Sequence, residues 1–131
     1  MGATTPLIMV LNQLDGAAAV DIRLEVREMV RRAGVDEVAS SAALLTTELV
    51  AGAFERGASA LILYAECDAR HVRVEVGDAF RSGGPRNASA APEAGVIRRR
   101  LLDGLTDGWG SVANDDGDLV WFDVGIRSPA G

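Results

Sequence analysis

Two carboxylates that lie far apart in the sequence, Glu48 and Asp78, are the side chains most suggestive of chemistry. Glu48 lies in a stretch with helical spacing, and a glutamate on such a face can act as a general base where it borders a ligand. Asp78 continues the alternation of the valines at 72–76, so its carboxylate is expected to point toward the core side. There it needs hydrogen-bond donors, which a ligand amine such as that of adenine would supply. The alternatives are a solvated glutamate and an aspartate that caps its own loop.

Gly52 and a run of three arginines add to this set. Gly52 follows Glu48 by one helical turn and costs about 1 kcal/mol relative to alanine, which indicates close packing or the loss of an earlier side chain. Arg98, Arg99 and Arg100 could together bind an anion, or they could form a solvated face because they diverge around a helix. A further hypothesis is that Arg98 turns inward and forms an ion pair with Asp78 or Glu48.

Hydrophobic periodicity predicts the elements that must position these residues. The predicted helices span residues 17–33, 36–57 with Asp36 as N-cap, and 95–106. The predicted strands span residues 6–11 as an edge strand, 61–67 and 72–76 as a hairpin, 109–113 and 119–126. Paired helices and hairpin strands predict an α/β (α+β) two-layer sandwich, in which a mixed, mostly antiparallel sheet packs on three helices.

The stretch 79–94 shows neither the alternation of a strand nor the three-and-four spacing of a helix, and it is rich in Gly, Pro, Ser, Asn and Ala. Because loops of this length inside a compact domain are usually functional or disordered, we predict a lid over 79–94. A chain of 131 residues predicts a single domain over 1–131, with a flexible tail at 127–131.

Composition narrows the functional classes. A net charge of −6 disfavours direct contact with nucleic acid or an anionic membrane. One cysteine, Cys67, and one histidine, His71, provide neither a disulfide nor a zinc ligand set, which favours a reducing cytoplasm. These two residues flank the hairpin turn, but without a third orienting group they make a poor nucleophilic dyad. The apolar opening at 6–11 is too short to span a bilayer and does not resemble a secretion signal.

Four segments, taken in order, carry a resemblance to a known family. They read TELVAGAFERGA (47–58), VRVEVGD (72–78), LLDGLTDGWG (101–110) and GDLVWFDV (117–124). The chain resembles the anti-sigma regulatory kinases of the GHKL ATPase superfamily, in particular the short versions from actinobacteria. The resemblance implies a Bergerat-type ATP site, serine kinase activity toward STAS-domain anti-anti-sigma factors, binding of sigma factors, and a homodimer.

Carried over position by position, the resemblance retains the two carboxylates and loses most other nucleotide contacts. Glu48 matches the family's catalytic base and Asp78 matches the adenine-binding aspartate, whereas Gly52 stands where an asparagine holds Mg²⁺. Arg98 takes the place of a phosphate-loop glycine unless a gap brings Gly95 into use, and Leu119 replaces a threonine at the adenine end. The implied degenerate ATP pocket comprises Gly52, Asp78, Gly83, Gly84, Gly95, Arg98 and Leu119.

Three lost contacts of about 1.5 to 3 kcal/mol each would weaken Mg-ATP binding by about three decades or more. We therefore expect a regulatory domain with weak or no ATP and magnesium binding, which sequesters a sigma factor or a STAS anti-anti-sigma factor. One alternative is an active serine kinase with Glu48 as base, in which water or another carboxylate replaces the asparagine. Another is a dimeric scaffold unrelated to sigma factors.

Overall fold

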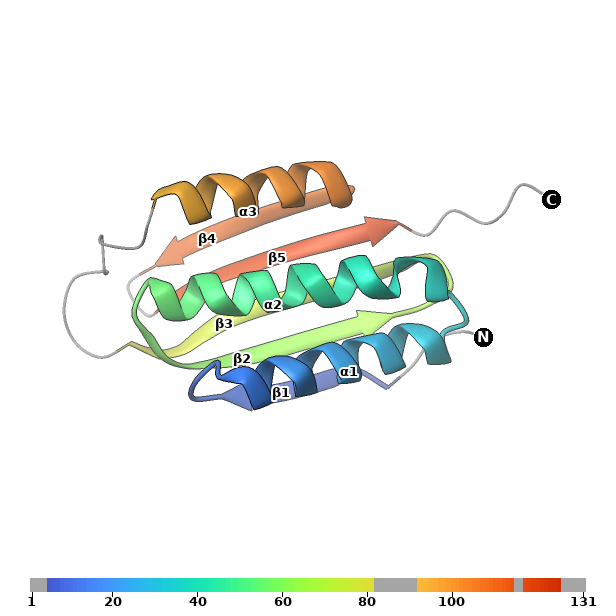
Figure 1. The fold of residues 1–131 in the computed structure, drawn as a ribbon, viewed down its shortest axis with the longest axis horizontal. Helices are drawn as coiled ribbons and strands as arrows, with labels where there is room; N and C mark the ends of the chain where they lie inside the picture. Colours follow the sequence, from blue (N-terminus) through green and yellow to red (C-terminus); the bar gives the residue numbers. More distant parts are fainter. Residues whose placement is uncertain (1–4, 82–91, 115–116, 126–131) are drawn as a thin grey trace.

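The computed structural model describes residues 5–81, 92–114 and 117–125. Its elements are β1 (Leu7–Leu11), α1 (Gly16–Arg32), a 3₁₀ turn η1 (Asp36–Val38), α2 (Ala39–Glu55), β2 (Ala58–Cys67), β3 (His71–Arg81), α3 (Pro92–Leu105), β4 (Gly108–Asn114) and β5 (Gly117–Gly125). The helices α1, α2 and α3 lie side by side over one face of the sheet (Figure 1). This arrangement confirms the predicted two-layer α+β sandwich.

The sheet has the strand order β1-β2-β3-β5-β4, and every pairing among the described residues is antiparallel. The predicted edge position of the first strand is confirmed, because β1 pairs only with β2 there. The connection through α3 places β5 next to β3 and leaves β4 at the opposite edge (Figure 1). As a result α3 and β4 border the second half of α2, where the candidate site lies.

One hydrophobic core fills the space between the sheet and the helices. In each strand every second residue points toward the helices. In each helix the apolar residues spaced three and four apart form the stripe that faces the sheet. Burying one large apolar side chain contributes roughly 1.5 to 3 kcal/mol, so these positions define the fold. The largest fully buried apolar side chains are Ile22, Val26, Val30, Leu45, Val50, Leu61, Leu63, Val72, Val74, Val76 and Phe122.

At the ends of the first two helices, the structure confirms the predicted glycine stops but not the predicted N-cap. Asp15 caps α1 by accepting a hydrogen bond of 2.8 Å from the backbone N–H of Ala18. Gly34 and Gly57 have positive φ angles of 80° and 103°, which confirms both as stop signals. The predicted N-cap at Asp36 is wrong, because Asp36 begins the 3₁₀ turn and α2 follows Val38 without a side-chain cap.

The predicted lid is too long at both ends. Residues 79–81 continue β3, because Phe80 and Arg81 pair with Ala60 and Ala58 of β2 past an irregularity in register. Residues 92–94 already belong to α3, which begins at Pro92 rather than at Gly95. Proline suits the first position of a helix because an N–H there would have no helical acceptor. The remaining lid residues and the predicted tail at 127–131 lie outside the described residues.

Among the described helices, none combines the length and the apolar composition needed to cross a bilayer.

Candidate functional site

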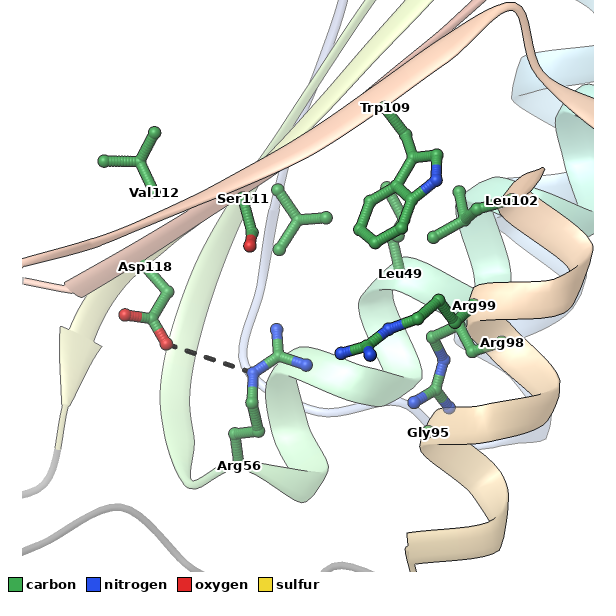
Figure 2. Close-up of a pocket in the computed structure, with 11 residues that line it drawn as sticks. Leu49, Arg56, Gly95, Arg98, Arg99, Leu102, Trp109, Ser111, Val112 and Asp118 are labelled. Atoms are coloured by element: carbon green, nitrogen blue, oxygen red, sulfur yellow. Dashed lines mark ion pairs between the residues drawn. The ribbon is translucent and has the colours of Figure 1, made fainter.

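A cavity of about 260 Å³ opens between α2, α3 and the strands β4 and β5 (Figure 2). Its wall is apolar where it meets the core and carries charged side chains around the opening. The lining residues are Leu49, Arg56, Gly95, Arg98, Arg99, Leu102, Trp109, Ser111, Val112, Asp118 and Val120. Three of them are arginines and one is an aspartate, so the charges that line the cavity are mainly positive.

Arg98 turns away from solvent and binds two glutamates of α2. Its side chain is only 12% exposed, and its Nη2 lies 3.3 Å from Oε2 of Glu48. The same guanidinium donates hydrogen bonds of 3.3 and 3.4 Å to the two carboxylate oxygens of Glu55. The hypothesis of an inward Arg98 is thus confirmed for Glu48, while Glu55 was not foreseen. We call Arg98, Glu48 and Glu55 the Arg98 clasp.

Gly52 makes room for this clasp. A Cβ built on Gly52 would lie 3.0 Å from Nη1 and 3.2 Å from Cζ of Arg98, and 3.0 Å from Nη1 of Arg56. A side chain at position 52 would therefore compete with the two guanidinium groups for the same space. Of the two interpretations of this glycine, the geometry supports close packing, and the packed group is a cation.

The clasp leaves one polar atom of Arg98 without a partner. Its Nε is buried and has no hydrogen-bond acceptor among the described residues. An unsatisfied buried donor costs about 1 to 3 kcal/mol. The contacts of Nη1 and Nη2 with the two glutamates must offset this cost.

A second ion pair crosses the opening of the cavity. Nε of Arg56, at the end of α2, lies 3.9 Å from Oδ2 of Asp118 on β5, whose side chain is 7% exposed (Figure 2). Sequence reasoning missed both residues. Arg56 follows Gly52 by one helical turn, which would have placed it on the Glu48 face. Asp118 shares the inward phase of Val120 and Phe122, which are buried.

The same alternation removes Leu119 from the cavity. Leu119 lies in register with Gly77, and a Cβ built on Gly77 would lie 3.6 Å from Cδ1 of Leu119. Both therefore belong to the outer face of the sheet, opposite the helices. The position that the resemblance assigns to the adenine end is occupied on the cavity side by Asp118 and Val120.

The structure brings together four of the predicted site residues and separates others. Glu48, Gly52 and Arg98 meet at the clasp, and Gly95 lines the cavity beside it. Asp78 is half-buried near the end of β3, in register with Leu61, and does not line the cavity. The predicted residues Gly83 and Gly84 lie outside the described residues.

Trp109 provides a fixed aromatic wall. Its Nε1 donates a hydrogen bond of 2.8 Å to Oδ1 of Asp103 on α3, which holds the indole ring in one orientation. Leu102 and Leu49, each 3% exposed, lie beside it in the lining. Arg99 enters from α3 and points into the cavity toward Arg56 (Figure 2). No carboxylate of the described residues forms an ion pair with Arg99.

The residues present do not fit the magnesium site that the resemblance implies. Mg²⁺ prefers oxygen ligands in octahedral geometry, and glycine at position 52 supplies no side-chain oxygen. The space beside it is taken by the guanidinium of Arg98. Within the described part of the chain, no three His, Cys, Asp or Glu side chains are grouped as a metal site.

Cys67 is not activated as a nucleophile. Burial, and to a lesser degree the nearby Asp68, raises the pKa of its thiol to about 11, so the thiol is protonated at neutral pH. His71 instead lies with its Nδ1 3.7 Å from Oδ1 of Asp68.

Comparison with known proteins adds no relative: no protein-family model and no curated protein matches the chain.

Proposed function

We propose that the chain is a regulatory protein-binding domain of the cytoplasm, built like an anti-sigma-factor kinase, that binds ATP weakly or not at all. It acts by sequestering a sigma factor or a STAS anti-anti-sigma factor. The observation that supports this most is the Arg98 clasp over Gly52. The resemblance supplies the class of partner and a homodimeric state.

The clasp opposes nucleotide binding in two ways. A magnesium ion next to Glu48 would have to displace the guanidinium of Arg98, which holds that carboxylate at 3.3 Å. The ion would also meet the positive charges of Arg56 and Arg99 without gaining a ligand from Gly52. Magnesium-dependent catalysis by Glu48 is therefore disfavoured as long as Arg98 stays in place.

Apolar side chains on the face of the sheet opposite the helices support a protein-binding role. Val10 and Ile62 are cross-strand partners and are 66% and 44% exposed, and Ile8 is 63% exposed beside them. Neighbouring exposed apolar side chains are typical of surfaces that contact other proteins.

Calorimetric titration with Mg-ATP tests the proposal. We expect the wild type to bind no tighter than about millimolar, since three contacts of the family pattern are absent. The double variant Gly52→Asn/Arg98→Gly restores two family positions and removes the internal cation, so it is expected to bind at least about tenfold tighter. Arg100→Gly, on the same helix but outside the clasp, is the matched control and should leave binding unchanged.

A second measurement separates sequestration from catalysis. Purified sigma factors and STAS proteins from the native host are titrated one by one in the absence of nucleotide, and we expect one of them to bind. Micromolar Mg-ATP binding by the wild type, with phosphate transfer to a STAS protein that Glu48→Ala abolishes, would establish the kinase instead. Failure of every sigma factor and STAS protein to bind would leave the dimeric scaffold.

A further inference from the structure

We propose that the cavity between α2, α3 and β4–β5 binds a small aromatic monocarboxylate. The inference comes from the shape and chemistry of the lining and does not rest on the proposed function. It assigns this space to a class of ligand other than the nucleotide that the family resemblance implies.

The inner wall suits an aromatic ring. Leu49, Leu102 and Val120 are buried residues of the core whose surfaces also border the cavity. Trp109 adds a flat aromatic surface that its hydrogen bond to Asp103 holds in place. Because this wall is already formed, a ring could enter without ordering new side chains.

The opening suits a single carboxylate. Arg56 and Arg99 come from different helices and direct their guanidinium ends into the same space (Figure 2). A planar guanidinium matches the geometry of a carboxylate, and two of them on opposite sides can bind its two oxygens. Arg56 forms an ion pair of 3.9 Å with Asp118, and Arg99 has no ionic partner among the described residues. The hydroxyl-bearing Ser111 also lines this region.

Size and charge limit the ligand further. A volume of about 260 Å³ has room for roughly nine water molecules, since each occupies about 30 Å³ in the liquid. A benzoate-sized anion fits this space, whereas a nucleoside triphosphate is larger than the space. Asp118 would repel a highly charged anion, and the guanidinium of Arg98 is already bound to two carboxylates. These features select one negative charge on a compact apolar body.

The two tryptophans provide an experiment with an internal reference. Trp109 lines the cavity, whereas Trp121 is in register with Gly110 and Glu75 on the outer face of the sheet. Benzoate is titrated against the ¹⁵N-labelled chain without magnesium, and the two indole N–H signals are followed by NMR. The neutral analogue benzamide has nearly the same shape and reports the contribution of the charge.

We expect benzoate to shift the Trp109 signal saturably, with a Kd of about 0.1 to 1 mM, and to leave the Trp121 signal in place. Benzamide should bind about tenfold more weakly, and Arg99→Gln should weaken benzoate about tenfold. Arg100→Gln is the matched control, because Arg100 is exposed on the same helix and does not line this cavity. It should leave the affinity within about twofold.

Several outcomes would overturn the inference: no saturable shift of Trp109, equal shifts of both indoles, or equal affinities for benzoate and benzamide. The charge comparison with benzamide uses the wild type, so it remains decisive even if Arg99→Gln alters the fold. Tight, Glu48-dependent Mg-ATP binding would refute the proposed function and leave the benzoate result standing. Absence of benzoate binding together with absence of Mg-ATP binding would refute only the present inference.

Discussion

Two arginines on opposite faces of the sheet each bind two carboxylates, but in different surroundings. Arg73, on the outer face, lies 3.0 Å from Glu75 and 3.8 Å from Asp123 and stacks at 4.6 Å over the ring of Trp121. Its side chain is 31% exposed. Arg98, on helix α3, is 12% exposed and binds two glutamates of the neighbouring helix α2.

The two clusters differ in what determines them. Asp123 is the cross-strand partner of Arg73, and Glu75 lies two residues along the same strand, so strand register alone produces the outer cluster. Glu55 is 43 residues from Arg98 in the sequence, so only the packing of α3 against α2 brings them together. The outer cluster is a surface feature of small energetic value, whereas the inner one occupies a candidate site.

Each cluster also lies over a glycine, and the two glycines tolerate change differently. A Cβ on Gly110 would lie 2.9 Å from Nε1 and 3.0 Å from Cε2 of Trp121, which belong to a rigid ring. A Cβ on Gly52 would meet the ends of flexible arginine side chains. A side chain at Gly110 would therefore clash with a rigid ring, whereas a side chain at Gly52 would push aside flexible guanidinium groups.

The largest expected effect is that of Gly110→Ala. The indole of Trp121 must tilt away and lose its packing and its contact with Arg73, so we expect a loss of about 2 kcal/mol in the free energy of unfolding. Urea denaturation measures it. Gly104→Ala is the control: nothing lies within 4 Å of its built Cβ, and alanine should raise helix stability by up to about 1 kcal/mol. A loss below about 0.5 kcal/mol for Gly110→Ala would contradict the shape requirement.

Removing the clasp by Arg98→Ala should have the next largest effect. It leaves Glu48 and Glu55 without their shared cation and removes the packing of the arginine stem. Both glutamates are partly exposed, so solvent screens their repulsion, and we expect destabilisation of about 1.5 kcal/mol. The exposed Arg100→Ala should change stability by less than about 0.5 kcal/mol. Equal effects of the two variants would remove the distinction between clasp and surface arginine.

A smaller effect is expected when the outer cluster is broken by Arg73→Ala. Its ion pairs are partly exposed and its ring contact lies at the surface, so the loss should stay below about 1 kcal/mol. In 1 M salt most of this loss should disappear, because the Debye length falls to about 3 Å. A salt-independent loss as large as that of Arg98→Ala would show that the two faces are equivalent.

The smallest effect on stability is expected at Asp68, in the turn between β2 and β3. The carboxylate of Asp68 accepts its hydrogen bonds from backbone N–H groups. Hydrogen bonds from the N–H groups of Arg70 and His71, at 2.7 and 3.0 Å, lower the pKa of this carboxyl. Because the pKa of Asp68 is lower in the folded state, its carboxylate stabilises the fold at pH values above the unfolded-state pKa. This stabilisation is lost as the pH falls through the folded-state pKa. The stability difference between wild type and Asp68→Asn should therefore shrink between pH 6 and pH 2. A difference that stays constant would exclude the ionised carboxylate as its source.

Most of the fold could be predicted from the sequence because its signals are local. Alternation identified the strands, including the edge strand, and spacing identified three helices with stops at Gly34 and Gly57. The errors lie at element ends: Asp36 begins a 3₁₀ turn, and residues 79–81 remain in β3. Such ends depend on which backbone partners the neighbouring element offers, and that information is absent from a local pattern.

The candidate site could be predicted only in part. The shared face of Glu48 and Gly52 and the inward turn of Arg98 were anticipated. The sequence also did not predict Asp118, although the buried phase of β5 points to it, because the family resemblance assigns a role to the neighbouring position, Leu119.

By itself, the sequence determined the two layers and the phase of each strand and helix, since both follow from hydrophobic periods of two and of about 3.6 residues. Only the tertiary structure decided that the cation over Gly52 is Arg98, that Glu55 shares it, and that Arg56 and Arg99 meet across one cavity. The physical reason is distance: an ion pair requires atoms within a few ångströms, and residues on α2 and α3 come that close only when both helices pack on the same sheet.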